Sequence, residues 1–310
     1  MTEERKMYDI IILGGGPAGY TAALYAARAG LEALVLERLS AGGQMALSHQ
    51  IDNYPGFEEG IDGFTLADKM KRQAERFGAR SRSTEVQAVS LSESPKRIVT
   101  DSGEYFAKTV VIATGANPRK LGLPAEEMLL GRGVGYCASC DGMFYRGKTV
   151  AVVGGGNTAA SDAMLLSRVA KKVYLVHRRD SLRATRVYHE PLEKAENVEL
   201  CWNCEVTEIL HESRVTGLRL RDVRTGDTRE ISCDGLFISI GRQPVTEFLA
   251  GQLPLSPEGY ILAGEDTRTA IPGVFAAGDV RQKALRQVVT AVADGAAAVT
   301  AAEEFLAGGL

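Results

Sequence analysis

The sequence predicts an α/β fold of two Rossmann-like (three-layer ββα) domains, the second inserted into the first. A short apolar run, a glycine-rich turn, a helical stretch and a second apolar run follow one another in residues 8–37. The same order recurs in residues 149–177, and the segment GVFAAGDV at 273–280 suits the first unit but follows the second. The chain of 310 residues is long enough for two domains, since single cores stop growing at roughly 250 to 300 residues.

The first unit begins with the apolar run at residues 8–13, which predicts a strand. Gly14, Gly16 and Gly19 follow, then the helical stretch AGYTAALYAARAG and the apolar run ALVLE, which ends at Glu37. Such glycines let the backbone approach a pyrophosphate, which the free N–H groups of a helix N-terminus bind. A lone GxGxxG is a weak signal, but one between a strand and a helix predicts a dinucleotide site.

The second unit aligns with the first at a constant offset of 140 residues. Gly154 corresponds to Gly14, Gly156 to Gly16, and Ala159 to Gly19. The repeat predicts a second dinucleotide site. A tight turn without a ligand is the alternative for each copy.

The residue at the end of the second strand contacts the adenosine ribose and so indicates which nucleotide binds. The carboxylate of Glu37 can accept hydrogen bonds from both ribose hydroxyls, as FAD or NAD requires, and would repel a 2′-phosphate. The second unit has His177 there, followed by Arg178, Arg179 and Arg183 in HRRDSLRA. Guanidinium groups bind a phosphate dianion, so this pattern indicates NADP, with a solvated basic turn as the alternative.

Two further segments fit the first nucleotide. TVVIATGANP at 109–118 is an apolar strand that runs into Thr114 and Gly115, and GVFAAGDV ends a strand at Gly278 and Asp279. Because the second segment follows the whole second unit, the C-terminal part of the chain completes the first domain. We expect an FAD domain of residues 1–117 and 245–310 and an NADPH domain of residues 118–244. The linkers would lie near 116–118 and 241–244, each with a proline.

Composition excludes several classes of protein. The net charge of −3 and the even spread of Lys and Arg give no basic surface for nucleic acid. The apolar run near the N-terminus breaks at glycines and is too short for a signal peptide or a membrane span, so we expect a cytoplasmic protein. Five cysteines, an odd number, argue against a framework of structural disulfides.

Two CxxC pairs raise the possibility of a zinc site. About 60 residues separate the pairs, however, whereas a zinc ribbon has roughly 15 to 20. VELCWNCEVTEIL is typical of a strand, in which Cys201 and Cys204 would point to opposite faces. We therefore expect these two residues, and Cys233, to be ordinary strand residues.

Cys137 and Cys140 lie in a stretch, residues 134–145, that lacks strand alternation and can open a helical turn. Positions i and i+3 of a helix share one side, so the two side chains can form a disulfide, and N–H groups at the helix start would stabilise a thiolate. Asp141 follows directly and can move a proton to or from a thiol. A redox-active dithiol is our interpretation, and a buried inert pair is the alternative.

With these residues identified, the chain resembles the low molecular weight thioredoxin reductases from residue 8 to its end. The matching stretches are GGGPAGYTAALYAARAG, GGQ (42–44), DNYPG (52–56), ATGA (113–116), CASCDG, GGGNTA, HRRDSLRA, GVFAAGDV and the pair Arg286 and Gln287. CxxCDG just before the second glycine-rich unit, with HRRD after it, is the most specific combination. Ser139, between the cysteines, and Ser161 with Asp162 depart from many members.

The resemblance implies that NADPH reduces FAD, that the flavin reduces a Cys137–Cys140 disulfide, and that the dithiol reduces thioredoxin. It places Cys140 against the flavin, assigns exchange with thioredoxin mainly to Cys137, and makes Asp141 the acid–base catalyst. It also implies a homodimer and an alternation of the two domains about the linkers.

The resemblance extends to the cofactor contacts. The C-terminal Ala-rich segment predicts a helix whose N-terminus faces the flavin. The residues expected to contact FAD are Gly14, Gly16, Pro17, Ala18, Gly19, Glu37, Arg38, Gly43, Gln44, Asn53, Ala113, Thr114, Gly115, Gly278, Asp279, Arg286, Gln287 and Val288. Those expected to contact NADPH are Gly154, Gly156, Asn157, Thr158, His177, Arg178, Arg179, Arg183, Gly241 and Arg242.

Three other functions share parts of this pattern. Flavoproteins that serve a peroxiredoxin carry an additional N-terminal domain, whereas here the first nucleotide motif begins at Tyr8. Ferredoxin-NADP reductases of this fold lack the CxxC. A redox sensor or nucleotide-binding scaffold would not need Asp141 or the arginines, so the reductase is the favoured function.

Overall fold

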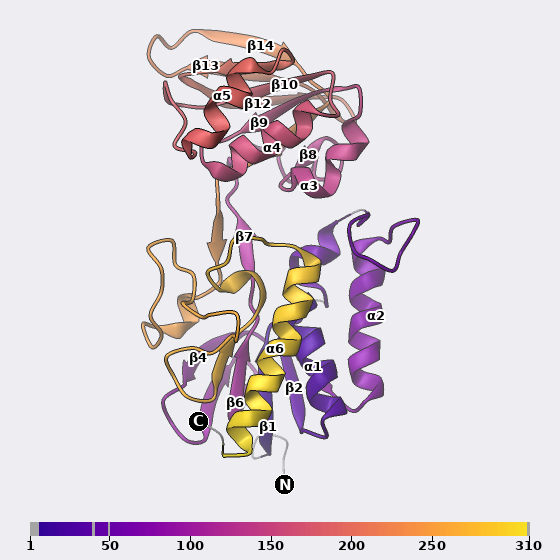
Figure 1. Ribbon diagram of the computed structural model, residues 1–310, viewed down its shortest axis with the longest axis vertical. Coiled ribbons are helices and arrows are strands. Elements are labelled where there is room, and N and C mark those ends of the chain that lie inside the picture. Colours follow the sequence, from indigo (N-terminus) through magenta and orange to yellow (C-terminus); the bar gives the residue numbers. More distant parts are fainter. Residues whose placement is uncertain (1–5, 39–40, 49, 309–310) are drawn as a thin grey trace. The chain divides into compact units, whose positions relative to one another are not determined.

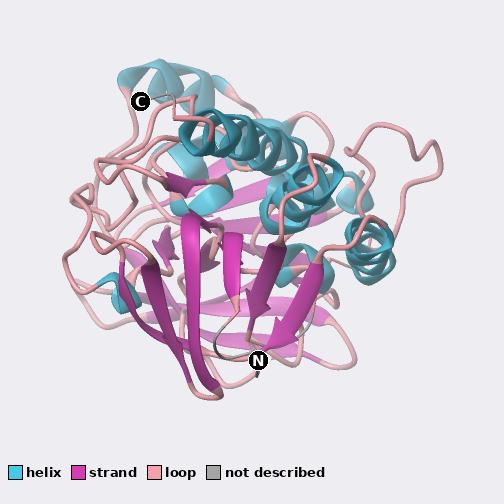
Figure 2. Cartoon of the chain, turned by 90° about the horizontal axis from the view of Figure 1, so that it is seen from below, coloured by secondary structure: helices cyan, strands magenta, loops and turns pink. Residues whose placement is uncertain are grey.

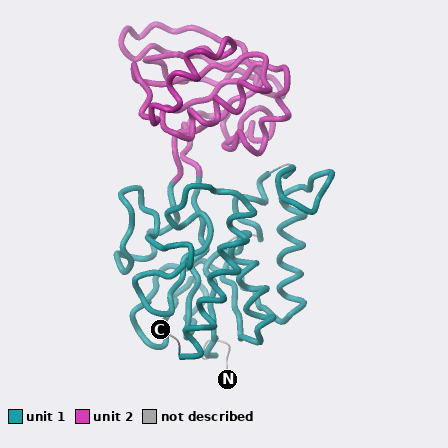
Figure 3. Tube along the Cα trace, viewed as in Figure 1, with its two compact units in different colours: residues 1–117, 243–310 teal, residues 118–242 magenta. Residues whose placement is uncertain are grey.

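The structure, a computed structural model, describes residues 6–38, 41–48 and 50–308. The chain divides into two compact units (Figure 3): unit 1 is Met1–Asn117 with Gln243–Leu310, and unit 2 is Pro118–Arg242. Unit 2 ends at Arg242 rather than at the expected residue 244. The reason is that the segment leaving it forms β16 (Arg242–Pro244), which pairs with β7 (Ala116–Pro118) of the entering segment.

Unit 1 contains a seven-stranded sheet in the order β3-β2-β1-β6-β5-β4, with β17 paired to β6. β1, β2, β3, β6 and β17 form parallel pairs, whereas β4, β5 and β6 pair antiparallel. The strands are β1 (Met7–Leu13), β2 (Ala33–Glu37), β3 (Arg80–Ser83), β4 (Val86–Ser90), β5 (Lys96–Thr100), β6 (Gly103–Ile112) and β17 (Val274–Ala276).

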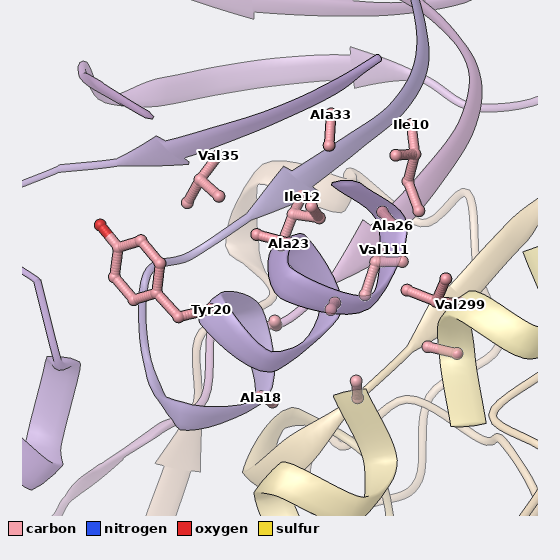
Figure 4. Packing of buried hydrophobic residues seen from close by; sticks show 14 of the residues in the cluster. Ile10, Ile12, Ala18, Tyr20, Ala23, Ala26, Ala33, Val35, Val111 and Val299 are labelled. Carbon is pink, nitrogen blue, oxygen red and sulfur yellow. The ribbon is translucent and has the colours of Figure 1, made fainter. Parts of the chain in front are cut away.

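Side chains of β1 alternate between two buried clusters, as the pleat of a strand requires. Ile10 and Ile12 lie in the cluster formed with α1 (Pro17–Arg28) and α6 (Val288–Leu306), which Figure 4 shows. Ile11 and Leu13 lie in the cluster on the opposite face. Helices gather on one side of this sheet (Figure 2), so the sheet has a helical layer on one face and strands and loops on the other.

One helix of unit 1, α2 (Gly63–Arg76), begins at a side-chain cap. Asp62 caps α2 by accepting a hydrogen bond from the Thr65 N–H over 2.8 Å.

α1 and α6 lie side by side (Figure 1), and Gly295 of α6 permits this approach because a Cβ there would lie 2.3 Å from the Ala18 carbonyl oxygen.

Unit 2 repeats the layering with a parallel sheet in the order β11-β10-β9-β15-β8 and an antiparallel sheet β12-β13-β14. One buried cluster fills the space between the two sheets, and another joins the parallel sheet to its helices. The strands are β8 (Val134–Gly135), β9 (Thr149–Val153), β10 (Lys172–Val176), β11 (Val198–Cys201), β12 (Cys204–His211), β13 (Val215–Asp222), β14 (Thr228–Ser232) and β15 (Gly235–Ile238). The predicted fold of two three-layer α/β domains is confirmed.

The helices of unit 2 are α3 (Ala138–Asp141), α4 (Asn157–Ser167) and α5 (His189–Lys194). α1 and α4 both begin one residue after a glycine N-cap, Gly16 and Gly156. The 140-residue offset of the sequence motifs is thus an offset of equivalent structural positions. Short 3₁₀ helices are Gly43–Leu47, Gly142–Tyr145, Arg186–Tyr188, Glu247–Leu249 and Gly278–Val280.

Within the described ranges, no helix has the length and apolar character that crossing a bilayer would need.

Candidate redox centre and nucleotide sites

The glycine-rich turn of unit 1 is packed too tightly for any side chain at two positions. A Cβ at Gly14, where φ is 104°, would lie 2.5 Å from the Ala113 carbonyl oxygen, and one at Gly19 would lie 1.9 Å from the Gly14 carbonyl oxygen. A Cβ at Gly16 would meet no atom within 4 Å, and no side chain caps the helix there. The start of α1 beside Gly16 is therefore open and has no side-chain cap, which fits an anionic ligand such as a pyrophosphate.

Glu37 lies directly against this turn. Its Oε2 accepts a hydrogen bond from the Gly15 N–H over 2.5 Å. Gly15 was not among the residues predicted for the site. The middle glycine of the GGG run is the sequence signal for it, since a Cβ there would lie 3.0 Å from the same carboxylate oxygen.

Segments far apart in the sequence meet the turn of unit 1. The Gly42 N–H donates to the Gly15 carbonyl over 2.7 Å, which sets the segment 42–44 against the turn. Gly278 approaches from the C-terminal part, where a Cβ would lie 3.0 Å from that of Ala18. The Thr114 hydroxyl donates to the Val245 carbonyl over 2.7 Å.

Side chains of the predicted flavin-site residues also pair across the unit. The Asn53 amide donates to Gln287 Oε1 over 3.0 Å, although 234 residues separate the two. The Gln44 amide donates to Asn117 over 2.9 Å. Gly43, Ala113 and Gly115 lie in these segments, Pro17 and Val288 are the first residues of α1 and α6, and Asp279 follows Gly278.

Two arginines predicted for the flavin site have other neighbours. The guanidinium of Arg38 donates to Glu85 at the surface over 3.3 Å. The guanidinium of Arg286 lies 4.2 Å from the ring centroid of Tyr260. The structure therefore brings the glycines and the polar segments of the first site together, whereas Arg38 points to a surface carboxylate.

The glycine-rich turn of unit 2 has the same construction. A Cβ at Gly154 would lie 2.3 Å from the Ser239 carbonyl oxygen, and a Cβ at Gly156 would meet nothing within 4 Å. The ring of His177 occupies the place that the Glu37 carboxylate has in unit 1, because a Cβ at Gly155 would lie 2.1 Å from it. His177 is buried, and burial together with the nearby arginines lowers its pKa.

The basic residues of this unit surround the same turn. Arg178, Arg179 and Arg183 are exposed, and the Arg183 N–H donates to the Gly155 carbonyl over 2.7 Å. Asn157 accepts from the Thr185 N–H over 2.7 Å. Exposed guanidiniums beside an open helix N-terminus fit a ligand with more than one phosphate.

The remaining predicted contacts of the second nucleotide lie around this turn and at the exit of the unit. Thr158 is exposed in the first turn of α4. Gly241, with φ of 105°, accepts a hydrogen bond from the Arg119 N–H over 3.0 Å. Arg242 begins β16. The pKa of the half-buried Asp162 carboxyl is raised by burial, against which the charge of Arg242 acts to lower it.

Cys137 and Cys140 form a disulfide, with Cα atoms 5.3 Å apart. Cys137 is the N-cap of α3, and its carbonyl accepts hydrogen bonds from the N–H groups of Cys140 (3.2 Å) and Asp141 (3.1 Å). Both cysteines are half-buried. One helical turn thus carries the disulfide and the acid on the same short segment.

Asp141 is suited to proton transfer near neutral pH. Burial raises the pKa of its carboxyl to about 6. Its Oδ2 would lie 3.1 Å from a Cβ at Gly135, so the carboxyl rests against the backbone of β8. A carboxyl with this pKa can both donate and accept a proton under cellular conditions.

The sequence profile of the pyridine nucleotide-disulphide oxidoreductases matches residues 8–295. The chain belongs to this family. A flavin and a pyridine nucleotide are the cofactors that the family implies, in agreement with two glycine-rich turns and one disulfide.

Relatives within the pyridine nucleotide-disulphide oxidoreductases are similar along almost the whole chain. Thioredoxin reductase of Streptomyces clavuligerus is 48% identical over 302 residues, covering 96% of this chain and 94% of the relative. Thioredoxin reductase of Listeria monocytogenes is 44% identical, covering 99% and 96%. The crystal structure of thioredoxin reductase from Streptococcus pyogenes matches with a TM-score of 0.91 at 43% identity, covering 97% of this chain and 99% of that one. The resemblance drawn from the motifs is confirmed.

In this oxidoreductase the second CxxC does not lie in one strand, and that prediction was wrong. Trp202 and Asn203 form a tight turn between β11 and β12, which belong to different sheets. Cys201 and Cys204 are buried in the same cluster rather than on opposite faces. Because only the two turn residues separate the strands, the sequence resembles that of one continuous strand. The left-handed conformation of Asn203, with φ of 52°, ends β11 and turns the chain into β12.

Burial also explains the chemistry of the three remaining cysteines. It raises the pKa of Cys201 to about 11 and that of Cys233 to about 12, and it raises the pKa of Cys204. These thiols stay protonated at neutral pH. Among the described residues, no three His, Cys, Asp or Glu side chains converge as metal ligands.

Glu126 and Tyr136 support the redox segment of this oxidoreductase and were not predicted. Glu126 is buried, and its carboxylate accepts hydrogen bonds from the Tyr136 hydroxyl and from the backbone N–H groups of 121–123. Tyr136 directly precedes Cys137. A carboxylate several residues before a CxxC has no fixed spacing to it, so the sequence carried no signal for this contact.

Proposed function

We propose that the chain is an NADPH-dependent thioredoxin-disulfide reductase that uses FAD. The Cys137–Cys140 disulfide, placed at one helical turn with Asp141, is the observation that carries the proposal. Relatives that cover almost the whole chain are thioredoxin reductases, and that of Mycobacterium leprae is a bifunctional thioredoxin reductase/thioredoxin. Thioredoxin is therefore the protein disulfide that this chain reduces.

We assign FAD to unit 1 and NADPH to unit 2. The carboxylate of Glu37 beside the first turn supports a nucleotide with free ribose hydroxyls. The exposed Arg178, Arg179 and Arg183 around the second turn support a nucleotide with a 2′-phosphate. When bound, the flavin and the nicotinamide supply the hydride transfer that delivers two electrons to the Cys137–Cys140 disulfide.

The chain's own residues perform the exchange with the protein substrate. One thiolate of the reduced pair attacks a sulfur of the thioredoxin disulfide, which forms a mixed disulfide and releases one thioredoxin thiolate. The second thiolate attacks the mixed bond, so the Cys137–Cys140 disulfide forms again and thioredoxin leaves as a dithiol. Asp141 supplies and removes the protons at the thiols, because its raised pKa keeps both of its forms populated near neutral pH.

Turnover with purified protein tests this function. The protein should be yellow, and NADPH should be oxidised only when thioredoxin or a small disulfide is present. NADH should support a much lower rate. The Cys140→Ser variant should retain the yellow cofactor but lose turnover. Colourless protein, or NADPH oxidation that Cys140→Ser leaves intact, would contradict the proposal.

Assembly and location remain expectations of the same proposal. The chain should form a homodimer in the cytoplasm, where thioredoxin is kept reduced. Sedimentation at micromolar concentration measures the first, and a monomer throughout would contradict it.

A further inference from the structure

The turn between β11 and β12 is joined to the basic segment that follows β10. The His177 N–H donates to the Cys201 carbonyl, the Cys204 N–H donates to the His177 carbonyl, and the Asn203 N–H donates to the Arg179 carbonyl, each over 3.0 Å. These three bonds fix the backbone on both sides of Arg178. The first arginines of the cluster are therefore held in place by a turn more than twenty residues away in the sequence.

The side chains of this turn continue the same connection. The rings of Trp202 and His177 meet edge to face, with centroids 6.4 Å apart, and the His177 ring lies against Gly155. The Gly155 carbonyl in turn accepts the hydrogen bond from the Arg183 N–H. A continuous set of contacts thus runs from the turn to the glycine-rich loop and to the last arginine of the cluster.

Between the anchored arginines, the side chain of Leu182 is buried in the core cluster of the parallel sheet and its helices. Residues 180–182 line a cavity of about 180 Å³ together with Trp202 and parts of α5. Arg178 and Arg179 are exposed. The backbone that carries their guanidiniums is therefore held by the hydrogen bonds at 177, 179 and 183 together with the packing of Leu182.

Asn203 is the residue that permits the turn. It adopts φ of 52°, a left-handed conformation that asparagine and glycine tolerate and that β-branched residues avoid. Its carbonyl accepts a hydrogen bond from the Val223 N–H over 2.7 Å, which ties the turn to the end of β13. Cys201 and Cys204, which flank the turn, are buried in one core cluster.

We propose that the turn 201–204 is a positioning element that sets the preference of unit 2 for a nucleotide with a 2′-phosphate. Groups that are ordered before the ligand arrives lose less conformational entropy on binding. The turn bonds directly to the backbone at 177 and 179 and reaches the glycine-rich loop only through the His177 ring, so its effect falls mainly on the 2′-phosphate. This inference rests on the assignment of NADPH to unit 2.

Two nucleotide fragments separate the 2′-phosphate from the rest of the ligand. Adenosine 2′,5′-bisphosphate and adenosine 5′-monophosphate are titrated into the oxidised, flavin-loaded protein, with calorimetry as the readout. Fluorescence of Trp202, the chain's single tryptophan, is a second readout for each variant that keeps it. The dissociation constant of the monophosphate divided by that of the bisphosphate measures the preference for the 2′-phosphate.

Asn203→Val should reduce that ratio by roughly tenfold, through weaker binding of the bisphosphate with unchanged binding of the monophosphate. Asn203→Gly should restore the ratio, because glycine accepts the same φ. Ala250→Val places the same strain at an exposed residue of unit 1, where φ is 48°, and should leave the ratio unchanged. If Asn203→Val does not fold, Trp202→Leu tests the ring contact with His177 and should reduce the ratio in the same way.

Each outcome decides between two ideas. A wild-type protein with no preference for the bisphosphate would overturn the NADPH assignment and this inference with it. A wild-type preference that survives in both Asn203→Val and Trp202→Leu would overturn the role of the turn alone. A parallel loss of affinity for both fragments would also overturn it, since that result indicates general damage to the site.

Discussion

The hydroxyl of Tyr136 donates a hydrogen bond to the buried carboxylate of Glu126, with 2.5 Å between the two oxygens. The same carboxylate accepts the backbone N–H groups of residues 121–123, and Tyr136 directly precedes Cys137. The segment that carries the disulfide is thus anchored to the chain that enters unit 2. Burial and the neighbouring carboxylate raise the pKa of Tyr136, so its hydroxyl remains a donor at physiological pH.

Removal of this hydroxyl should destabilise unit 2. We expect Tyr136→Phe to lower the free energy of unfolding by about 1 to 3 kcal/mol, because one acceptor position of a buried carboxylate loses its donor. Urea unfolding followed by circular dichroism measures this. Tyr25→Phe, at an exposed residue of α1, is the control and should change the stability by no more than about 0.5 kcal/mol. Equal stabilities of Tyr136→Phe and wild type would show that water replaces the lost donor.

The raised pKa of Asp141 predicts how the exchange reaction depends on pH. Its carboxyl changes protonation at about pH 6, so the rate of the reduced pair with a small disulfide should show an inflection there. Asp141→Asn should lack this inflection and react roughly 10² times more slowly. Stopped-flow measurement of pre-reduced protein between pH 5 and pH 8 checks both, and an unchanged profile in Asp141→Asn would refute the role.

The same group predicts a stability effect with a definite sign. The pKa of Asp141 is raised in the folded state above the ordinary value of an aspartate, so the folded protein binds more protons and the free energy of unfolding falls as the pH rises from about 4 to about 6. Asp141→Asn removes this dependence. The free energy of unfolding of the variant minus that of wild type should therefore be larger above pH 6 than at pH 4. Denaturant unfolding at both pH values measures the change, and a constant difference would contradict it.

Asp294 of α6 holds the segment that follows β17. Its buried carboxylate accepts hydrogen bonds from the Gly278 N–H (2.8 Å), from Arg281 (2.8 and 2.9 Å) and from Lys283 (2.8 Å). These contacts lower its pKa against the opposing effect of burial. Asp294→Ala would leave Lys283 without its carboxylate partner and the buried Arg281 with only the exposed Glu265, which costs about 3 to 5 kcal/mol.

The measurement for Asp294→Ala is thermal unfolding together with flavin content, because Gly278 lies in the proposed flavin site. Glu265→Gln is the matched control, since Glu265 also contacts Arg281 but its side chain is 93% exposed. We expect the control to change stability by no more than about 1 kcal/mol. Similar losses of thermal stability in the two variants would contradict the view that burial makes the Asp294 carboxylate the more important partner of Arg281.

Two glycines of the first turn should respond differently to the same added methyl group. Gly19→Ala places it 1.9 Å from the Gly14 carbonyl, so the fold should lose about 3 kcal/mol or more. Gly16 has φ of −79° and open space around it, so Gly16→Ala should fold normally. It should nevertheless bind flavin more weakly, because the methyl group enters the space proposed for the pyrophosphate. Flavin retention on gel filtration and unfolding curves separate the two effects.

Local sequence determined the elements of both units and the positions of their turns. Gly14 and Gly154, at the 140-residue offset, each terminate a strand and have φ values above 100°, which only glycine adopts without strain. The i, i+3 spacing of Cys137 and Cys140 is met by a single helical turn. Such features depend on residues close together in the chain, so their signals are present in the sequence.

Tertiary structure alone decided the contacts that support these elements. The carboxylates of Glu126 and Asp294 find their partners through the folding of loops, and no periodicity or motif specifies which donors they meet. The turn at Asn203 could not be predicted for the same reason. Residues 198–210 have the pattern of one strand, and nothing in that pattern shows that Asn203 is left-handed. Burial, which sets the pKa of Asp141, is likewise a property of the packed unit and not of the residue itself.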